Sequence, residues 1–337
     1  MAVKAGLVEE ALEAVVVDSP YSFSWFGKRV GALPPKIRKA VGAAGMRDYL
    51  KHNLRARLYR DFYCRGRATP AEDAPSSRGP VGLMPFLIGL SVANVGSGSR
   101  ETGWVVRAIE EGRVVVQRNG LSIWVDRDQI YAAPREELRA GEQRDVRFPK
   151  ELLNQFPGFY MALGDQGLAQ SFAMTVVRFY WNLQSGGASR LMMAATRHLN
   201  NSKIPFQLKV LNRPDLYDRC DAGVLYVYKP DYPQVAHIVR RIYSDLTGYL
   251  KPDTPVFTKQ LAPGLAVAES PPDLTVSFGN SRCDLLAEGI IRVHEQTTGP
   301  LSTRMEIVAA SFRDAEVNLE LPFLNSGSVD DYGFPLP

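Results

Sequence analysis

The chain has 337 residues, of which 45% are hydrophobic and 23% are charged, with a net charge of +4. This composition is typical of a soluble globular protein, and the length suits roughly two domains of about 150 residues or one large α+β domain with extensions. The longest basic stretch is HNLRARLYR, at residues 52–60. An anionic small group is therefore a better candidate ligand than nucleic acid, because nucleic-acid-binding proteins carry a denser basic surface.

The residues that hold metals or disulfides are sparse. Cys64, Cys220 and Cys283 lie far apart, and this odd count argues against a disulfide framework and a zinc site. The four histidines also lack metal-ligand spacing. The N-terminal sequence carries acidic residues among its apolar ones, unlike a signal peptide. No run of about 18 apolar residues predicts a membrane span. We expect a cytoplasmic protein that uses no metal or cofactor.

Residues 1–66 are expected to be helical. In DYLKHNLRARLYRDFYCRG (48–66), apolar side chains recur at helical spacing and Gly66 provides a stop signal. The composition of residues 68–80 predicts a loop, either a mobile lid or a linker, and the linker is the simpler interpretation.

A small antiparallel sheet is predicted across residues 81–132, where short strands surround the turn sequences EEG and RNG. Trp104 and Trp124 are expected in its core rather than as platforms for a ligand. Residues 134–164 are expected to form a polar connection with a short helix.

The second half of the chain alternates strands and helices. The predicted strands are TVVRFYWNL (175–183), PFQLKVL (205–211), AGVLYVY (222–228), PVFTKQL (255–261), LAVAE (265–269) and TVSFGN (275–280). The predicted helices are GGASRLMMAATRHLNN (186–201), DYPQVAHIVRRIYSDLTGYL (231–250) and SRCDLLAEGIIRVHEQ (281–296), and the tail 329–337 is expected to be unstructured. Together these elements predict an α+β fold. Its mixed or antiparallel sheet is packed by helices and follows an N-terminal helical and small-sheet region.

Cations recur on the strands and strand ends of this half. They are Arg178, Lys209, Arg219, Lys259 and Arg282. Each alone is more simply a solvated residue, and a lysine within an apolar strand is often a gatekeeper at a sheet edge. Several strands that each present a cation on one face would instead form a phosphate pocket.

Strand alternation gives these cations polar neighbours. Arg178 is expected to share a face with Tyr180 and Asn182, and Lys209 with Gln207. Arg282 is expected at the start of a helix, where free backbone amides favour anions.

The sequence blocks in this half resemble a known family. VRFYWNL, IPFQLKVLNRPDLYDRCDAGVLYVYKPDY, PVFTKQLAPGLAVAESP and SFGNSRCDLLAEGI are similar to the HopA-type type III effector family of plant-pathogenic bacteria. They are still more similar to its homologues in class V lanthipeptide and thioamitide biosynthesis. The order of the blocks also resembles the lyase portion of class III lanthipeptide synthetases and, more distantly, the phosphothreonine lyase effectors. The resemblance covers roughly residues 150–295, with weaker likeness in LYRDFYCRG (58–66) and in the stretch from TGWVV to NGLSIWV (102–125).

The resemblance implies a phosphoserine/phosphothreonine lyase that acts without a cofactor. A separate aminoglycoside-phosphotransferase-like kinase would phosphorylate a precursor peptide. This chain would then eliminate phosphate and leave dehydroalanine or dehydrobutyrine. The resemblance further implies a lyase domain at residues 150–337, preceded by a region at 1–149 for contact with a leader peptide or partner. No membrane or nucleic acid is implied as a partner.

The family blocks also imply roles for single residues. Lys209 would be the base that removes the α-proton, and neighbouring cations favour the neutral, basic form of a lysine. The phosphate would be held by Arg178, Arg219, Lys259 and Arg282, with Tyr180, Asn182 and Gln207 completing the site. The same cations would stabilise the departing phosphate.

The chain departs from the phosphothreonine lyases at one position. Those enzymes pair their lysine with a histidine that protonates the leaving group, whereas Gln207 occupies the comparable strand here. The general acid is open between Tyr180, Tyr226 and His198. Other functions stay open as well. The chain could be a non-catalytic protein that binds phosphopeptide or a kinase, or a subunit that activates the kinase. It could also be a HopA-type effector.

Overall fold

The structure is a computed structural model, and it describes residues 5–31, 33–70, 83–110, 112–133, 137–153, 157–168, 174–273, 275–296 and 299–334. Its helices are α1 (Ala5–Ala14), α2 (Pro35–Asp61), α3 (Leu83–Ala93), α4 (Ala188–Asn201), α5 (Tyr232–Leu246), α6 (Phe278–Gln296) and α7 (Leu301–Arg313). Most of the predicted loop at 68–80 lies outside the described residues.

Every strand pair in the structure is antiparallel. A small sheet has the order β1 (Val15–Ser19), β2 (Ser22–Trp25), β3 (Lys28–Val30). The main sheet has the order β13 (Lys259–Ala262), β14 (Leu265–Glu269), β10 (Val176–Trp181), β12 (Gly223–Tyr228), β11 (Phe206–Leu211), β9 (Phe159–Leu163), β8 (Glu151–Leu152). A third has the order β6 (Leu121–Asp126), β5 (Arg113–Arg118), β4 (Arg100–Glu110), β7 (Gln143–Arg147). The predicted α+β class, with antiparallel sheets and helices, is confirmed.

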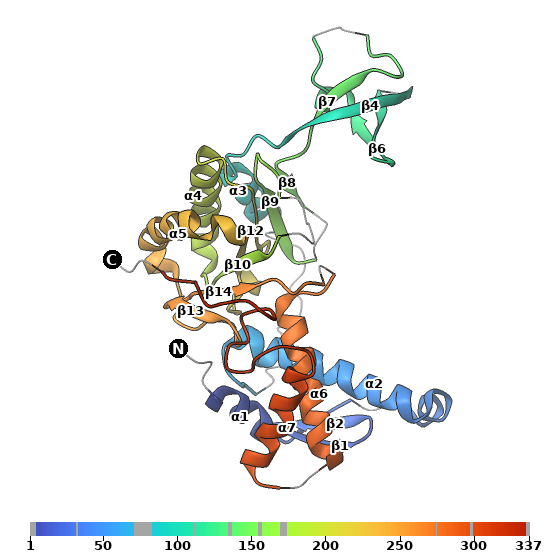
Figure 1. The fold of residues 1–337 in the computed structure, drawn as a ribbon, viewed down its shortest axis with the longest axis vertical. Coiled ribbons are helices and arrows are strands. Elements are labelled where there is room, and N and C mark those ends of the chain that lie inside the picture. Colours follow the sequence, from blue (N-terminus) through green and yellow to red (C-terminus); the bar gives the residue numbers. More distant parts are fainter. Residues whose placement is uncertain are drawn as a thin grey trace.

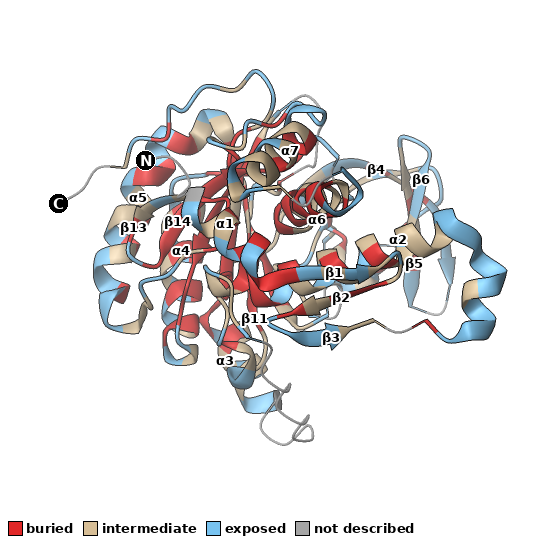
Figure 2. Ribbon diagram, turned by 90° about the horizontal axis from the view of Figure 1, so that it is seen from below, coloured by how far each residue is buried: buried red, intermediate tan, exposed pale blue. Residues whose placement is uncertain are grey.

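The central strands of the main sheet are buried on both faces, as their nearly continuous apolar sequences predict. One face packs on α4 and α5. The ring of Phe179 stacks on Tyr232 of α5 with centroids 5.4 Å apart, and a side chain at Gly223 would meet Leu191 of α4. The buried residues of this layer form the centre of the molecule (Figures 1 and 2). The opposite face carries the polar side chains of β10, β11 and β12.

The first 66 residues are not all helical. The segment between α1 and α2 forms β1–β3, which alternating side chains of Val15–Ser19 and the turn at Gly27 favour over a helix. Helices α1 and α2 pack against α7 and α6 at the lower end of Figure 1. Apolar residues from both ends of the chain therefore share one buried cluster. The division at residue 149/150 stays a prediction.

The predicted small sheet is present, but it spans residues 100–147 instead of 81–132. Residues 83–93, which were expected in the sheet, form helix α3 because their apolar run has no alternation. The small sheet stands at the upper end of Figure 1, away from the main sheet. Trp104 is buried in its core, but Trp124 is 54% exposed, which corrects the expectation for that residue. Trp124 lies next to buried Val125 on β6, so strand alternation turns it to the other face. The expected helix at 134–164 is replaced, where the structure describes it, by β7, β8 and β9.

The C-terminal part differs from the prediction in three places. Helix α7 was not expected, since the helix predicted at 281–296 was taken as the last one. Residues expected as a strand at 275–280 instead include the start of α6, where the Ser277 hydroxyl accepts a hydrogen bond from the Asn280 amide at 3.3 Å, as at a helix N-cap. The tail is ordered up to residue 334. Tyr332 is buried and donates a hydrogen bond to Glu269 at 2.6 Å. Residues 335–337 lie outside the described residues.

Candidate active site on one face of the main sheet

The strand register brings most of the predicted site residues together. Residues directly opposite each other in antiparallel strands project to the same face. Arg178 on β10 and Gln207 on β11 both pair with Tyr226 on β12. Tyr180 and Lys209 both pair with Val224, the second residue along from Tyr226 on the same strand. All five polar residues therefore lie on the face opposite to α4 and α5.

Three cations on this face are separated by aromatic rings. The Lys209 ammonium lies 5.7 Å from the ring centroid of Tyr226, and the Arg178 guanidinium lies 5.2 Å from the same centroid. On its other side, Lys209 lies 4.6 Å from the ring of Phe159, which is 5.8 Å from the Arg219 guanidinium. The row of cations thus crosses β10, β12 and β11 and reaches the loop before β12. Cation–π contacts stabilise the charges without neutralising them.

Arg219 is fixed by a buried carboxylate. Its Nε donates to Asp221 at 2.5 Å and its Nη2 donates to the second oxygen of Asp221 at 2.7 Å. Nη2 also donates to the hydroxyl of Tyr59, from α2, at 3.0 Å. Burial favours the protonated form of Asp221, but the charge of Arg219 outweighs burial and lowers the pKa of Asp221. Arg219 therefore has a fixed orientation.

Arg178 donates a hydrogen bond from its Nε to the Ser270 hydroxyl at 2.8 Å, and it lies close to the hydroxyl of Tyr180. Neither Arg178 nor Lys209 forms an ion pair with a carboxylate within the described residues. Beside Arg178, the Tyr180 hydroxyl is buried without a hydrogen bond of good geometry to any described residue. Burial raises the pKa of Tyr180 to about 12 although the charge of Arg178 opposes this. The site thus keeps positive charge on Arg178 and Lys209 that no described carboxylate pairs with, next to a buried hydroxyl.

Tyr226 has a distinctive environment. Burial alone would raise its pKa, but the positive charges of Lys209 and then Arg178 stabilise the phenolate, and the pKa falls below its ordinary value of 10.0. A tyrosine between two cations is a stronger acid than a free one. Among the three candidates for the general acid, Tyr226 is the one that lies beside both cations. His198 is on α4, across the sheet from this face.

The two supporting residues have different surroundings. Gln207 is half-buried on the same face and donates to the Leu168 carbonyl at 3.4 Å. Asn182 follows the end of β10 and donates to the Asp253 carbonyl at 2.9 Å and to the Cys220 sulfur at 3.4 Å. Asn182 therefore fixes the loop that carries Arg219 and Asp221 and does not lie in the row of cations.

The structure separates Lys259 from the other cations. It pairs with Val267, which pairs with Phe179, so it projects to the face covered by α5. Its ammonium binds both carboxylate oxygens of Asp330, at 2.6 and 2.8 Å. The expectation of a shared face is corrected for this residue. The face of Lys259 depends on how β13 pairs with β14 and β14 with β10, which residue parity within a single strand does not give.

Arg282 is also placed differently from the expectation. Helix α6 begins four residues earlier, so Arg282 is not at its first turn. Its Nε donates to the Pro322 carbonyl at 2.6 Å and its Nη2 to the Leu324 carbonyl at 3.1 Å, while Nη1 donates to Ser281. Burial lowers the pKa of Arg282 to about 10 even though Tyr180 and Glu269 act in the other direction. Arg282 lies near Arg178 but binds the C-terminal segment.

Sequence reasoning missed several members of the site. Tyr59 and Tyr63 come from the N-terminal part of the chain and stack on each other at 5.3 Å. They approach α6 at Gly279, where a Cβ would lie 2.4 Å from Tyr63. Phe159 and Asp221 were also missed, although Asp221 follows Arg219 by two residues. The weaker likeness in LYRDFYCRG was the signal in the sequence for Tyr59 and Tyr63. Gly279 gave none, because it was expected in a strand and not in a helix.

Asp221→Asn is expected to slow any reaction at this site and to lower stability. The amide keeps one acceptor for Arg219 but removes the charge, which leaves a half-buried guanidinium without its ion pair. The cost should be about 1–3 kcal/mol. Thermal unfolding monitored by circular dichroism should show the lower melting temperature. A variant as stable as wild type would show that Asp221 does not fix Arg219 in this way.

The described residues contain no group of three or more histidine, cysteine, aspartate or glutamate side chains arranged to hold a metal ion. All three cysteines are free and buried. Within the same residues, no helix is both long and apolar enough to cross a membrane.

The chain was compared with known proteins. The model of the HopA1 effector protein family matches residues 150–324, more than half of the 337 residues. No curated protein sequence matches the chain. Among solved structures, the effector protein from Pseudomonas syringae pv. tomato strain DC3000 is similar with a TM-score of 0.46 and 16% identity, covering 83% of this chain and 95% of that one. The effector protein from Pseudomonas syringae pv. syringae strain 61 has a TM-score of 0.44 and 16% identity, covering 82% and 94%.

Proposed function

We propose that this chain, which belongs to the HopA1 effector protein family, is a phosphoserine/phosphothreonine lyase. It would eliminate phosphate from a phosphorylated precursor peptide to give dehydroalanine or dehydrobutyrine. A separate aminoglycoside-phosphotransferase-like kinase would supply the phosphopeptide. This proposal follows the resemblance of the sequence blocks to HopA-type proteins of class V lanthipeptide and thioamitide biosynthesis.

The observation that carries the proposal is the row of Arg178, Lys209 and Arg219 on one sheet face. Asp221 is the one carboxylate that contacts this row within the described residues, and it is bound to Arg219. The remaining excess of positive charge suits a phosphate group, which carries about two negative charges at neutral pH. Guanidinium groups bind phosphate through two parallel hydrogen bonds.

The reaction assigns a step to each group. The neutral amine of Lys209 accepts the α-proton, and the electrons of that C–H bond form the Cα–Cβ double bond. The Cβ–O bond breaks, and phosphate leaves with the electron pair. Arg178 and Arg219 stabilise the charge that develops on the leaving oxygen. Once Lys209 has accepted the α-proton, its charge and that of Arg178 favour release of the Tyr226 proton, and the phenol donates this proton to that oxygen.

The test is the incubation of the purified protein with synthetic peptides that carry one phosphoserine or one phosphothreonine. Mass spectrometry should detect loss of phosphoric acid and appearance of the dehydrated peptide, both with and without the partner kinase. Unphosphorylated peptides serve as controls. Tight binding without any dehydration, in the presence of the kinase as well, would favour the alternative of a non-catalytic phosphopeptide-binding effector.

Tyr226→Phe is expected to change the pH profile of elimination. If the phenol protonates the leaving oxygen, the rate should fall as the pH rises through the pKa of Tyr226. Because that pKa lies below 10.0, the decline should begin below the range of an ordinary tyrosine. The Phe variant should be slower by about 100-fold at neutral pH and should lack this decline. An unchanged profile in the variant would exclude Tyr226 as the acid.

A further inference from the structure

The N-terminal turns of α2 project from the molecule and bury almost nothing. We call residues 35–44 the α2 arm. Nearly all of these residues are exposed, and they form the pale-blue turns at the right of Figure 2. Ile37 and Val41 are 46% and 41% exposed and lie one helical turn apart, so they form a short apolar stripe. Isolated helical turns are marginal in water unless an apolar face is packed.

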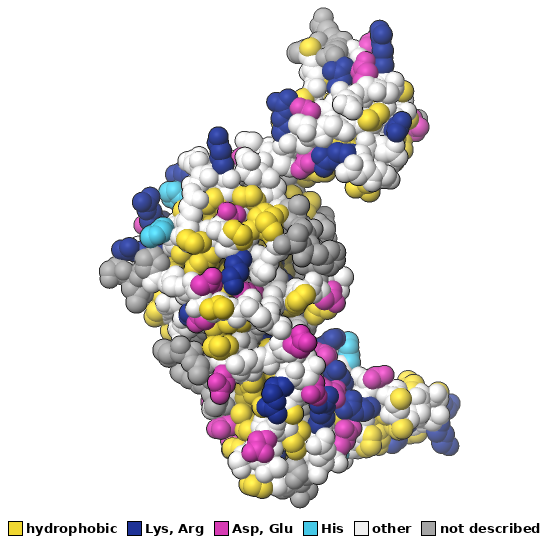
Figure 3. Space-filling model, viewed as in Figure 1, with side chains coloured by type: hydrophobic (Ala, Val, Ile, Leu, Met, Phe, Trp, Pro, Cys, Tyr) yellow, Lys and Arg dark blue, Asp and Glu magenta, His cyan; other side chains and the backbone are white. Residues whose placement is uncertain are grey.

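The α2 arm is also basic. It contains Lys36, Arg38 and Lys39 and no acidic residue. Lys36 and Lys39 have no ion pair within the described residues. Arg38 ties the arm to the small sheet, since its Nη1 donates to the Tyr21 hydroxyl at 2.5 Å. Figure 3 shows hydrophobic and basic side chains together on the projecting end of α2.

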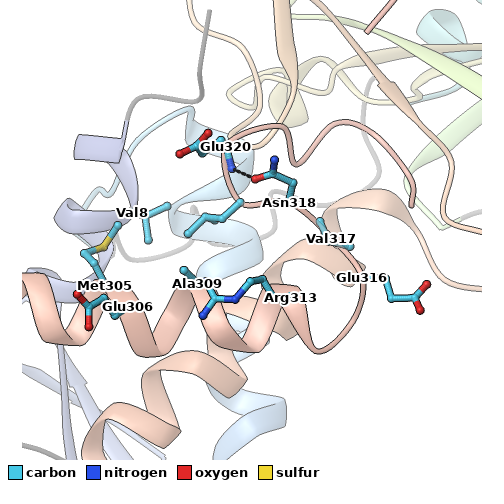
Figure 4. A pocket seen from close by; sticks show the side chains of 10 residues that line it. Val8, Met305, Glu306, Ala309, Arg313, Glu316, Val317, Asn318 and Glu320 are labelled. Atoms are coloured by element: carbon cyan, nitrogen blue, oxygen red, sulfur yellow. Dashed lines mark hydrogen bonds between the residues drawn. The ribbon is translucent and has the colours of Figure 1, made fainter. Parts of the chain in front are cut away.

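A groove of opposite charge lies at the same end of the molecule. We call it the α7 groove. It has a volume of about 750 Å³, and its apolar side includes Val8, Met305, Ala309, Val317 and Leu319. Glu306, Glu316 and Glu320 stand at separate points around it (Figure 4). These carboxylates are exposed and form no ion pair with any described residue. Among the described residues that line the groove, Arg313 is the one cation.

We infer that the α2 arm of one copy of this chain docks into the α7 groove of a second copy. The apolar stripe of Ile37 and Val41 would cover the apolar side of the groove. Lys36 and Lys39 would then approach the glutamates. The two surfaces match in both apolar character and charge, which is the complementarity that selects one partner over others.

The positions of the two surfaces favour a closed pair. The arm and the groove both belong to the end of the molecule formed by α1, α2 and α7 (Figure 1). Two copies related by a two-fold axis can therefore each insert an arm into the other. The same contact then forms twice, and neither arm nor groove of the dimer is left unoccupied. Gly42, with φ 67° and ψ −174°, interrupts α2 just after Val41 and sets the direction of the arm.

The test is the mass in solution of the full-length protein, measured by sedimentation velocity at about 100 µM, where even a weak dimer is populated. Wild type should be a dimer. Lys36→Glu with Lys39→Glu reverses the charge of the arm, and Glu306→Lys with Glu320→Lys reverses the charge of the groove. Each double variant alone should be a monomer, because its arm and groove now carry the same sign. These residues are exposed, so the variants should remain folded.

Mixing the two double variants should restore the dimer, since an acidic arm then meets a basic groove and a basic arm meets an acidic groove. The chain that carries all four substitutions should also dimerise. Arg197→Glu with Arg241→Glu, at exposed positions on α4 and α5, is the matched control and should stay dimeric. The inference would be overturned if wild type were a monomer, if either double variant alone were a dimer, or if the mixture of the two stayed monomeric. A monomeric wild type would favour a peptide as the partner of the groove.

Discussion

Lys209→Arg is expected to abolish phosphate elimination while the protein stays folded and still binds phosphopeptide. The guanidinium keeps the positive charge and the contacts with the rings of Phe159 and Tyr226. It stays protonated, however, and so cannot accept the α-proton. Loss of the base should reduce the rate by about 100-fold or more. The ratio of phosphorylated to dehydrated peptide in mass spectra measures the effect, and circular dichroism confirms folding.

The matched control is Lys203→Arg, an exposed position just beyond α4. It should eliminate phosphate at the wild-type rate. A cation that only binds phosphate would tolerate arginine, so this substitution separates a base from a binding group. If folded Lys209→Arg retained nearly normal activity, the base would lie elsewhere. Tyr226 would be the next candidate, because Lys259 projects to the opposite face.

The sequence predicted β10, β11, β12 and β14 of the main sheet well because their apolar runs are bounded by turn signals, whereas β8 and β9 were expected as a connection with a short helix. For β10, β11 and β12, alternation also placed Arg178, Tyr180, Gln207 and Lys209 correctly on shared faces. Within one strand, side-chain direction depends only on residue parity. This is why the candidates on these strands were found without knowledge of the topology.

Relations between distant elements could not be predicted in this way. Whether Lys259 faces Lys209 depends on the pairing through β14 and on a register shift after Gln260, neither of which leaves a trace in local sequence. Tyr59 and Tyr63 reach the site because α2 packs against α6, more than 200 residues later in the chain. The family model matches only from residue 150 onward. The weaker likeness in LYRDFYCRG contains both tyrosines but assigned them no role.

Arg178 and Arg282 are expected to differ when each is replaced by methionine, although both were candidates for binding phosphate. The difference follows from their remaining N–H groups. Arg178 uses its Nε for Ser270, and its two terminal nitrogens form no hydrogen bond of good geometry to a described residue. Arg282 uses all three nitrogens, two of them for the carbonyls of Pro322 and Leu324. Arg178 is therefore the group available to a ligand.

Arg178→Met should weaken phosphopeptide binding by roughly 100-fold or more, because two charge-assisted hydrogen bonds are worth about 1.5–3 kcal/mol each. Binding is best measured by calorimetry in the Lys209→Arg background, where the peptide stays phosphorylated. Arg282→Met should leave affinity nearly unchanged but lower the unfolding free energy, since each buried carbonyl left without a donor costs about 1–3 kcal/mol. The reverse pattern, with lost affinity in Arg282→Met and intact affinity in Arg178→Met, would move the phosphate toward α6 and away from the row of cations.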